Sequence, residues 1–185
     1  MITLIFNKDI LKILTIFSVS PGSNFKRNEL KDKTILNNVV LDSCLSKLIS
    51  SNVIIKNKKI YSVNFENDNS MQLLKLMLKS YKYLKEIPFD VYFLLIDLID
   101  YSSNLKSDIY LFGSYSKLIY KENSDIDIAV IGQSISKKFI IKLEKKYNKE
   151  IEIHDFSKDD FYKNKKDLLV SDILRNGLVL RKFYK

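Results

Sequence analysis

Two acidic residues separated by one apolar residue, Asp125 and Asp127, stand at the start of an apolar run that reaches Ile131. In a β-strand, alternate side chains point to the same face, so both carboxylates would share one face while Ile126 enters the core. Neighbouring carboxylates repel each other unless a cation lies between them. Mg²⁺ accepts oxygen ligands of this kind and keeps positions for substrate phosphates. The pair therefore predicts a divalent metal site.

A glycine and a serine, Gly113 and Ser114, directly follow the short apolar run at 109–112. Glycine lets a backbone come close to a phosphate, and exposed N–H groups with a hydroxyl hold an anion. Beside a metal-binding strand, this turn would hold a triphosphate while metal ions bridge its oxygens. In a two-metal site, one ion activates the attacking hydroxyl and the other stabilises the departing pyrophosphate.

A third carboxylate is expected from residues 149–156, where apolar and polar residues alternate strictly. The preceding helix, predicted at 137–147, is long enough to connect two parallel strands. Glu150, Glu152 and His154 would share one face, and Glu152 in the middle is the predicted third ligand. Glu150 and Asp155 are the reserve candidates. His154 is the only histidine; its position permits a metal or proton-transfer role, although a structural role is more common for such a residue.

The run LFGSYSKLIYKENSDIDIAVIG at 111–132 resembles the signature of the polymerase-β-like nucleotidyltransferase superfamily, and within it the minimal nucleotidyltransferases (MNT) of archaea and bacteria. Gly113, Ser114, Asp125 and Asp127 match in type and spacing, and a serine such as Ser124 commonly precedes the acidic pair. The ending DILRNGLVLRKF at 172–183 is similar to the last helix and strand of these domains. The resemblance covers about residues 88–185.

This resemblance implies transfer of AMP from ATP to a hydroxyl, with two Mg²⁺ ions and release of pyrophosphate. Asp125, Asp127 and Glu152 would be the catalytic and metal-binding residues, and Gly113, Ser114 and Ser124 would bind the nucleotide.

The implied acceptor is a tyrosine of a partner HEPN toxin, which would make the protein an antitoxin. The alternatives are a non-enzymatic DNA-binding regulator that senses nucleotide through a degenerate transferase domain, and a transferase for a small-molecule alcohol.

Two positions depart from the family pattern. Many relatives have a second glycine shortly after the Gly-Ser pair, where this chain has Leu118, and the third acidic residue is commonly Asp rather than Glu152. Both changes bear on whether the site is active, because a longer carboxylate shifts the oxygen that a Mg²⁺ ion requires.

The first third of the chain predicts three helices, near 10–17, 26–33 and 37–50, and then a hairpin with strands 53–55 and 60–63. This pattern resembles a winged helix-turn-helix domain, in which the third helix enters the major groove of duplex DNA. Lys47, Lys56, Lys58 and Lys59 would then contact DNA. The other interpretation is a small domain for protein contacts, and the third helix contains no Arg to read guanine.

Charge and cysteine content narrow the class of protein that is expected. The net charge is +9, and residues 1–65 contain ten basic and four acidic side chains. The single cysteine, Cys44, excludes an internal disulfide framework, and the first residues do not resemble a signal peptide, so a cytoplasmic protein without membrane partners is expected. We predict an α+β chain with a winged helix at 1–65, a helical connector at 66–87 and a nucleotidyltransferase domain with a mixed sheet at 88–185.

Overall fold

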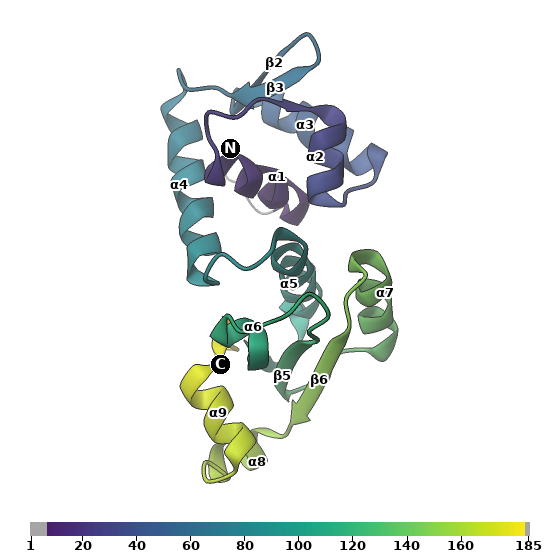
Figure 1. Cartoon of the computed structure of the whole chain (residues 1–185), viewed down its shortest axis with the longest axis vertical. Helices are drawn as coiled ribbons and strands as arrows, with labels where there is room; N and C mark the ends of the chain where they lie inside the picture. Colours follow the sequence, from purple (N-terminus) through teal and green to yellow (C-terminus); the bar gives the residue numbers. More distant parts are fainter. Residues whose placement is uncertain (1–6, 184–185) are drawn as a thin grey trace. The chain divides into compact units, whose positions relative to one another are not determined.

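A computed structural model describes residues 7–183 and divides the chain into two compact units, Met1–Phe93 and Leu94–Lys185 (Figure 1). The division falls within one helix, α5 (Phe89–Tyr101). The domain bounds predicted from the sequence remain a prediction, and the residues considered for a signal peptide, 1–6, lie outside the described part.

In its described part, from residue 7 on, the N-terminal unit contains four helices before α5 and a three-stranded antiparallel sheet with the strand order β1-β3-β2. Asparagine side chains cap three of the described helices: Asn7 accepts hydrogen bonds from the N–H groups of Asp9 and Ile10, Asn37 accepts one from Val40, and Asn67 accepts one from Asn69. Such caps satisfy N–H groups that the first helical turn leaves unpaired. The elements are α1 (Lys8–Val19), β1 (Phe25–Lys26), α2 (Arg27–Thr34), α3 (Asn38–Ser50), β2 (Ile54–Asn57), β3 (Ile60–Val63) and α4 (Asp68–Tyr83).

The predicted helices and hairpin of this unit are all present, but the sequence did not predict β1. This strand has two residues, too few to show an alternating pattern. It exists because Phe25 pairs with Tyr61 of β3 and packs its ring against Phe17 of α1, with 5.2 Å between ring centroids. Contacts far apart in the sequence therefore define it.

The C-terminal unit is built on a mixed four-stranded sheet with the strand order β6-β5-β4-β7. β5 and β6 are parallel, whereas β4 is antiparallel to both β5 and β7. This confirms the mixed sheet and the α+β class. The elements are the 3₁₀ helix η2 (Ser102–Asn104), β4 (Ser107–Leu111), α6 (Gly113–Lys117), β5 (Ile126–Gly132), α7 (Lys137–Tyr147), β6 (Ile151–Phe156), α8 (Lys158–Lys163), α9 (Leu168–Asn176) and β7 (Leu178–Arg181).

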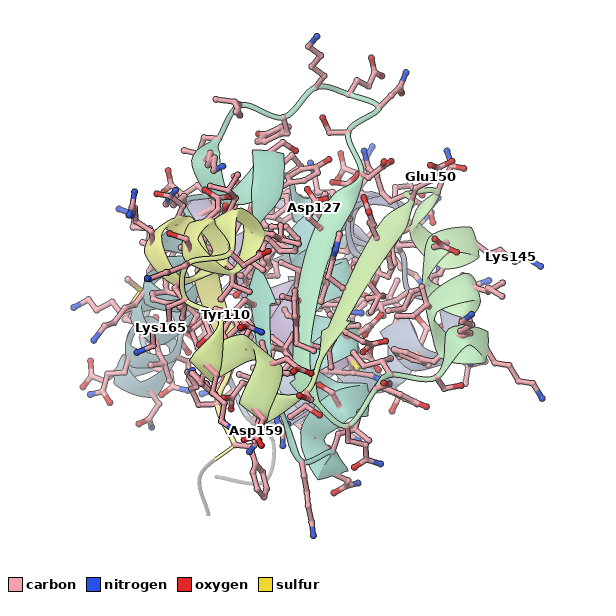
Figure 2. The ribbon with its side chains drawn as sticks, turned by 90° about the horizontal axis from the view of Figure 1, so that it is seen from below. Tyr110, Asp127, Lys145, Glu150, Asp159 and Lys165 are labelled. Carbon is pink, nitrogen blue, oxygen red and sulfur yellow. The ribbon has the colours of Figure 1, made fainter. Side chains whose placement is uncertain are left out.

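Both faces of the central strand β5 are buried. On one face, Ala129 and Ile131 join a core with side chains of β4, α8 and α9, while Ile126, Ile128 and Val130 on the other face are fully buried as well. Figure 2 shows α8 and α9 on one side of the sheet and α7 on the other. A strand buried on both faces reads as a continuous apolar run. Asp127 is therefore the one acidic residue within β5, and its position there requires a reason other than packing.

At the end of the sheet away from Asp127, a polar network holds the last strand in place. The Asp108 carboxylate accepts hydrogen bonds from the Tyr162 hydroxyl and the Phe183 N–H, at 2.8 Å each. Burial alone would raise the pKa of Asp108, but these two hydrogen bonds and the charge of Lys182 hold it below its usual value. Within residues 7–183, none of the helices is both long and apolar enough to span a bilayer.

Candidate active site

The pairing of β5 with β6 brings two of the three predicted acidic residues together, Asp127 and Glu152. In the parallel register, Asp127 lies opposite Glu152 and Ala129 lies opposite His154. Because partners in adjacent strands point to the same face, the side chains of Asp127, Glu152 and His154 share one surface of the sheet. In Figure 2, Asp127 lies near the end of the sheet that carries Glu150, and Asp159 lies toward the opposite end.

These three side chains form a group of possible metal ligands. One donor atom from each lies within 4.8 Å of the other two, and His154 Nε2 is 3.1 Å from Glu152 Oε1. The ring of Phe112 packs edge-on against the His154 imidazole, with 5.1 Å between centroids. The His154 side chain is 27% exposed and that of Glu152 is 56% exposed. The group is therefore held by the sheet on one side and open to solvent on the other.

The Gly-Ser turn packs directly against Asp127. Gly113 has a φ of +65°, and a Cβ added there would lie 1.9 Å from Asp127 Oδ2. The backbone N–H of Ser114 donates a hydrogen bond to the Asp127 carboxylate. Only glycine permits both the left-handed backbone and this approach, so Gly113 allows the orientation of the partly buried carboxylate.

The electrostatics of Asp127 explain why a cation would bind here. Burial raises the pKa of Asp127, and the negative charge of Glu152 raises it further. The Ser114 N–H and His154 lower the pKa in part, and Asp125 adds a smaller increase. The Ser114 N–H and His154 therefore compensate only part of the negative charge of Asp127 and Glu152. Clustered carboxylates of this kind are typical of sites that bind divalent cations.

Asp125 lies just before β5 rather than within it, is exposed, and is outside the three-residue group of ligands. It lines an open cavity of about 790 Å³ together with Glu150 and Glu152. The other lining residues come from the loop before β5, from α7 and the turn after it, and from the start of β6: Glu122, Asn123, Ser124, Glu144, Lys145, Asn148, Lys149 and Ile151. The cavity therefore meets the ligand group at Glu152 and offers space beside it.

The remaining candidates are placed as follows. The Ser124 hydroxyl accepts a hydrogen bond from the Lys121 N–H at 2.8 Å and so closes the loop before β5. Asp155 lies one residue out of phase with Glu152 and thus on the opposite face of β6. His154 was not among the predicted site residues, although its spacing of two residues from Glu152 was the signal that could have found it.

Leu118 stands where a second glycine was expected after the Gly-Ser turn. Helix α6 ends at Lys117, and the next residue, Leu118, has a φ of 59° and donates its N–H to the carbonyl oxygens of Ser114 and Tyr115. This left-handed conformation is the one that glycine adopts without cost. Leu118 therefore takes the backbone conformation that a glycine would provide, and the residue is 50% exposed.

Residues 104–182 match the family model of the polymerase beta nucleotidyltransferases. The matched segment contains all four strands of the mixed sheet, the Gly-Ser turn and the three-residue ligand group. The match therefore supports the predicted assignment to the polymerase-β-like superfamily and an activity of the nucleotidyltransferase type. No curated protein matches the chain.

We expect Gly113→Ala to displace Asp127, because the new Cβ would overlap its carboxylate and the backbone there is left-handed. The loss of stability should be roughly 2–4 kcal/mol, measured by urea unfolding, with nucleotide-dependent activity also lost. Gly22→Ala is the control, since nothing lies within 4 Å of its added Cβ. Equal stabilities of the two variants would contradict the proposed role of Gly113.

Asp127→Asn should stabilise the metal-free protein at pH 7. The folded-state pKa of Asp127 lies above its ordinary value of 3.8, so the folded protein binds a proton at this group more tightly than the unfolded chain does. The stability that depends on this proton is present at low pH and is lost as the pH rises through the raised value. At pH 7 the ionised carboxylate therefore lowers the free energy of unfolding. The gain should be on the order of 0.5–1 kcal/mol, since the side chain keeps some contact with solvent. It should shrink as the pH falls toward 4, which urea unfolding at several pH values would measure. A pH-independent difference would exclude this explanation.

Proposed function

We propose that this chain is a metal-dependent nucleotidyltransferase that transfers AMP from ATP to a hydroxyl group of a partner protein. The observation that supports this best is the convergence of Asp127 and Glu152 beside the Gly113–Ser114 turn. It occurs within the segment that matches the nucleotidyltransferase family model. The donor atoms, two carboxylates with an imidazole, suit a divalent cation.

In the proposed reaction, the acceptor oxygen forms a bond to the α-phosphorus of ATP, and the bond from that phosphorus to the pyrophosphate oxygen breaks. Asp125, Asp127 and Glu152 would hold the divalent cations, which supply activation of the hydroxyl and neutralisation of the pyrophosphate charge. Gly113 and Ser114 would bind the triphosphate. Glu152, which is 56% exposed and borders the open cavity, would bind the catalytic metal or take the proton from the acceptor.

Exposed apolar side chains favour a protein as the acceptor. Leu118 and Ile119 follow α6 directly and are 50% and 69% exposed. They lie between the Gly-Ser turn and Asp125 in the sequence, and apolar groups exposed beside a site are typical of surfaces that contact another protein. A tyrosine of a HEPN toxin is the acceptor that we propose, which would make the protein an antitoxin. A small-molecule alcohol is the alternative.

The N-terminal unit supports a second role, binding of duplex DNA through a winged helix. Its three-stranded sheet, with a hairpin after the third helix, has the element order of such a domain. Lys47 on α3 is exposed, as are Lys56, Lys58 and Lys59 on the hairpin. Arg27 donates hydrogen bonds to both carboxylate oxygens of Asp42, at 2.6 and 2.8 Å. The only arginine of this unit is therefore engaged within the protein, which favours phosphate contacts over guanine readout.

The transferase proposal is tested with ATP labelled at the α- or the γ-phosphate, a divalent cation and three acceptor conditions: a HEPN ribonuclease, an aminoglycoside, and none. We expect the α-label alone to appear on the ribonuclease. Asp127→Asn should lower the rate at least about 100-fold, because charge stabilisation at the reacting phosphate is lost.

Asp159→Asn is the matched control for this assay, since that exposed residue lies toward the opposite end of the sheet from Asp127 (Figure 2). Label on the aminoglycoside would support the small-molecule alternative. Binding of ATP without transfer to any acceptor would support a nucleotide-sensing regulator instead.

Replacing Lys56, Lys58 and Lys59 together by Gln should weaken binding of duplex DNA and reduce its salt dependence. Each lost phosphate contact lowers the slope of log K against log salt by about 0.9, so the triple variant should lose up to about 2.7. Fluorescence anisotropy at several salt concentrations measures this slope. A variant with the same three changes at Lys137, Lys138 and Lys142, exposed on α7 of the other unit, controls for net charge. Equal effects of both variants would contradict a specific surface.

A further inference from the structure

The ligand group on the sheet differs in one respect from the set of three carboxylates expected from the sequence. It contains an imidazole nitrogen, that of His154, whereas Asp125 stands outside the group before the start of β5. The donors that share one face of β5 and β6 are thus two oxygens and one nitrogen. This difference bears on which cation the site selects.

We propose that His154 is a metal ligand beside Asp127 and Glu152, and that the site binds first-row transition-metal cations in preference to Mg²⁺. The inference rests on the proposed function, since it concerns the metal of the same site. It changes the identity of the metal from the Mg²⁺ that the sequence led us to expect.

The spacing of the donor atoms fits this arrangement. Metal–donor distances of about 2.1 Å place neighbouring ligands of an octahedral ion about 3.0 Å apart and opposite ligands about 4.2 Å apart. His154 Nε2 and Glu152 Oε1 are 3.1 Å apart, close to the spacing of neighbouring ligands. The 4.8 Å limit on the whole group lies only a little above the spacing of opposite ligands, so small side-chain adjustments suffice.

The imidazole is held in a suitable orientation. The residue of β5 that lies opposite His154 is Ala129, so no large side chain of β5 stands beside the imidazole. The Phe112 ring meets the imidazole at an interplanar angle of 73°, and the side chain is 27% exposed. Packing of this kind limits the rotation of the ring and leaves Nε2 directed toward Glu152.

The types of the donor atoms determine which cation the site prefers. Mg²⁺ favours oxygen ligands and keeps much of its water, whereas imidazole is a good ligand for first-row transition metals. A site with one nitrogen and two carboxylates therefore gains affinity for Mn²⁺, Co²⁺ or Zn²⁺ but little for Mg²⁺. The more flexible Glu152, one methylene longer than the usual Asp, also suits ions that tolerate varied geometry better than Mg²⁺ does.

The test uses the full chain stripped of metal, without nucleotide. Free Mn²⁺ is followed by electron paramagnetic resonance during titration, and Mg²⁺ is then added as the competitor. We expect Mn²⁺ to bind at least about 10-fold more tightly than Mg²⁺, and His154→Ala to lower the Mn²⁺ affinity at least about 10-fold. The affinity for Mg²⁺ should change no more than about 3-fold. Circular dichroism checks that the variant is folded.

His154→Asp is the decisive companion variant, because it converts the group to an all-oxygen set of donors. It should bring the affinities for Mn²⁺ and Mg²⁺ close together, which a merely structural histidine would not do. Equal Mn²⁺ binding by the native chain and by folded His154→Ala would overturn the inference. Because binding is measured without ATP, failure of AMP transfer with His154-dependent Mn²⁺ binding intact would count against the transferase alone.

Discussion

The contact between the Asp127 carboxylate and the Gly113–Ser114 backbone is the constraint on which the site depends. A carboxylate inside a strand that is otherwise apolar on both faces is costly unless something compensates its charge. The Ser114 N–H supplies one hydrogen bond, and the absence of a side chain at Gly113 allows the approach. Glu152, on the neighbouring strand, adds negative charge rather than relief. In the proposed function, a bound divalent cation would compensate this charge.

The rest of the C-terminal unit positions these groups. Helix α7 connects β5 to β6 in parallel, which sets Glu152 opposite Asp127 and His154 two residues further along. The core formed by α8 and α9 on the same face supports the strands beyond the site, and the network around Asp108 holds the last strand. The site thus lies on regular strands rather than on loops, which favours exact placement of its ligands.

The N-terminal unit carries a different kind of surface. Its exposed lysines lie on the hairpin and on α3, whereas its one arginine is bound to Asp42. Long-range attraction to a polyanion requires only charge, but discrimination among bases requires donors that reach base edges. A regulator built on this unit would therefore owe much of its affinity to phosphate contacts and would depend strongly on salt.

The sequence by itself determined those features of the protein that depend on local patterns of residues. These are the helices and hairpin of the N-terminal unit, the alternating strand at Glu152, and the Gly-Ser and Asp-x-Asp residues typical of a nucleotidyltransferase. Only the tertiary structure decided that His154 joins Asp127 and Glu152 while Asp125 stands outside that group. It also showed that Leu118 adopts a glycine-like backbone and that β1 forms through Tyr61. The physical reason is that strand register and the exact start of a strand depend on pairing between distant segments, which periodicity along one segment does not encode.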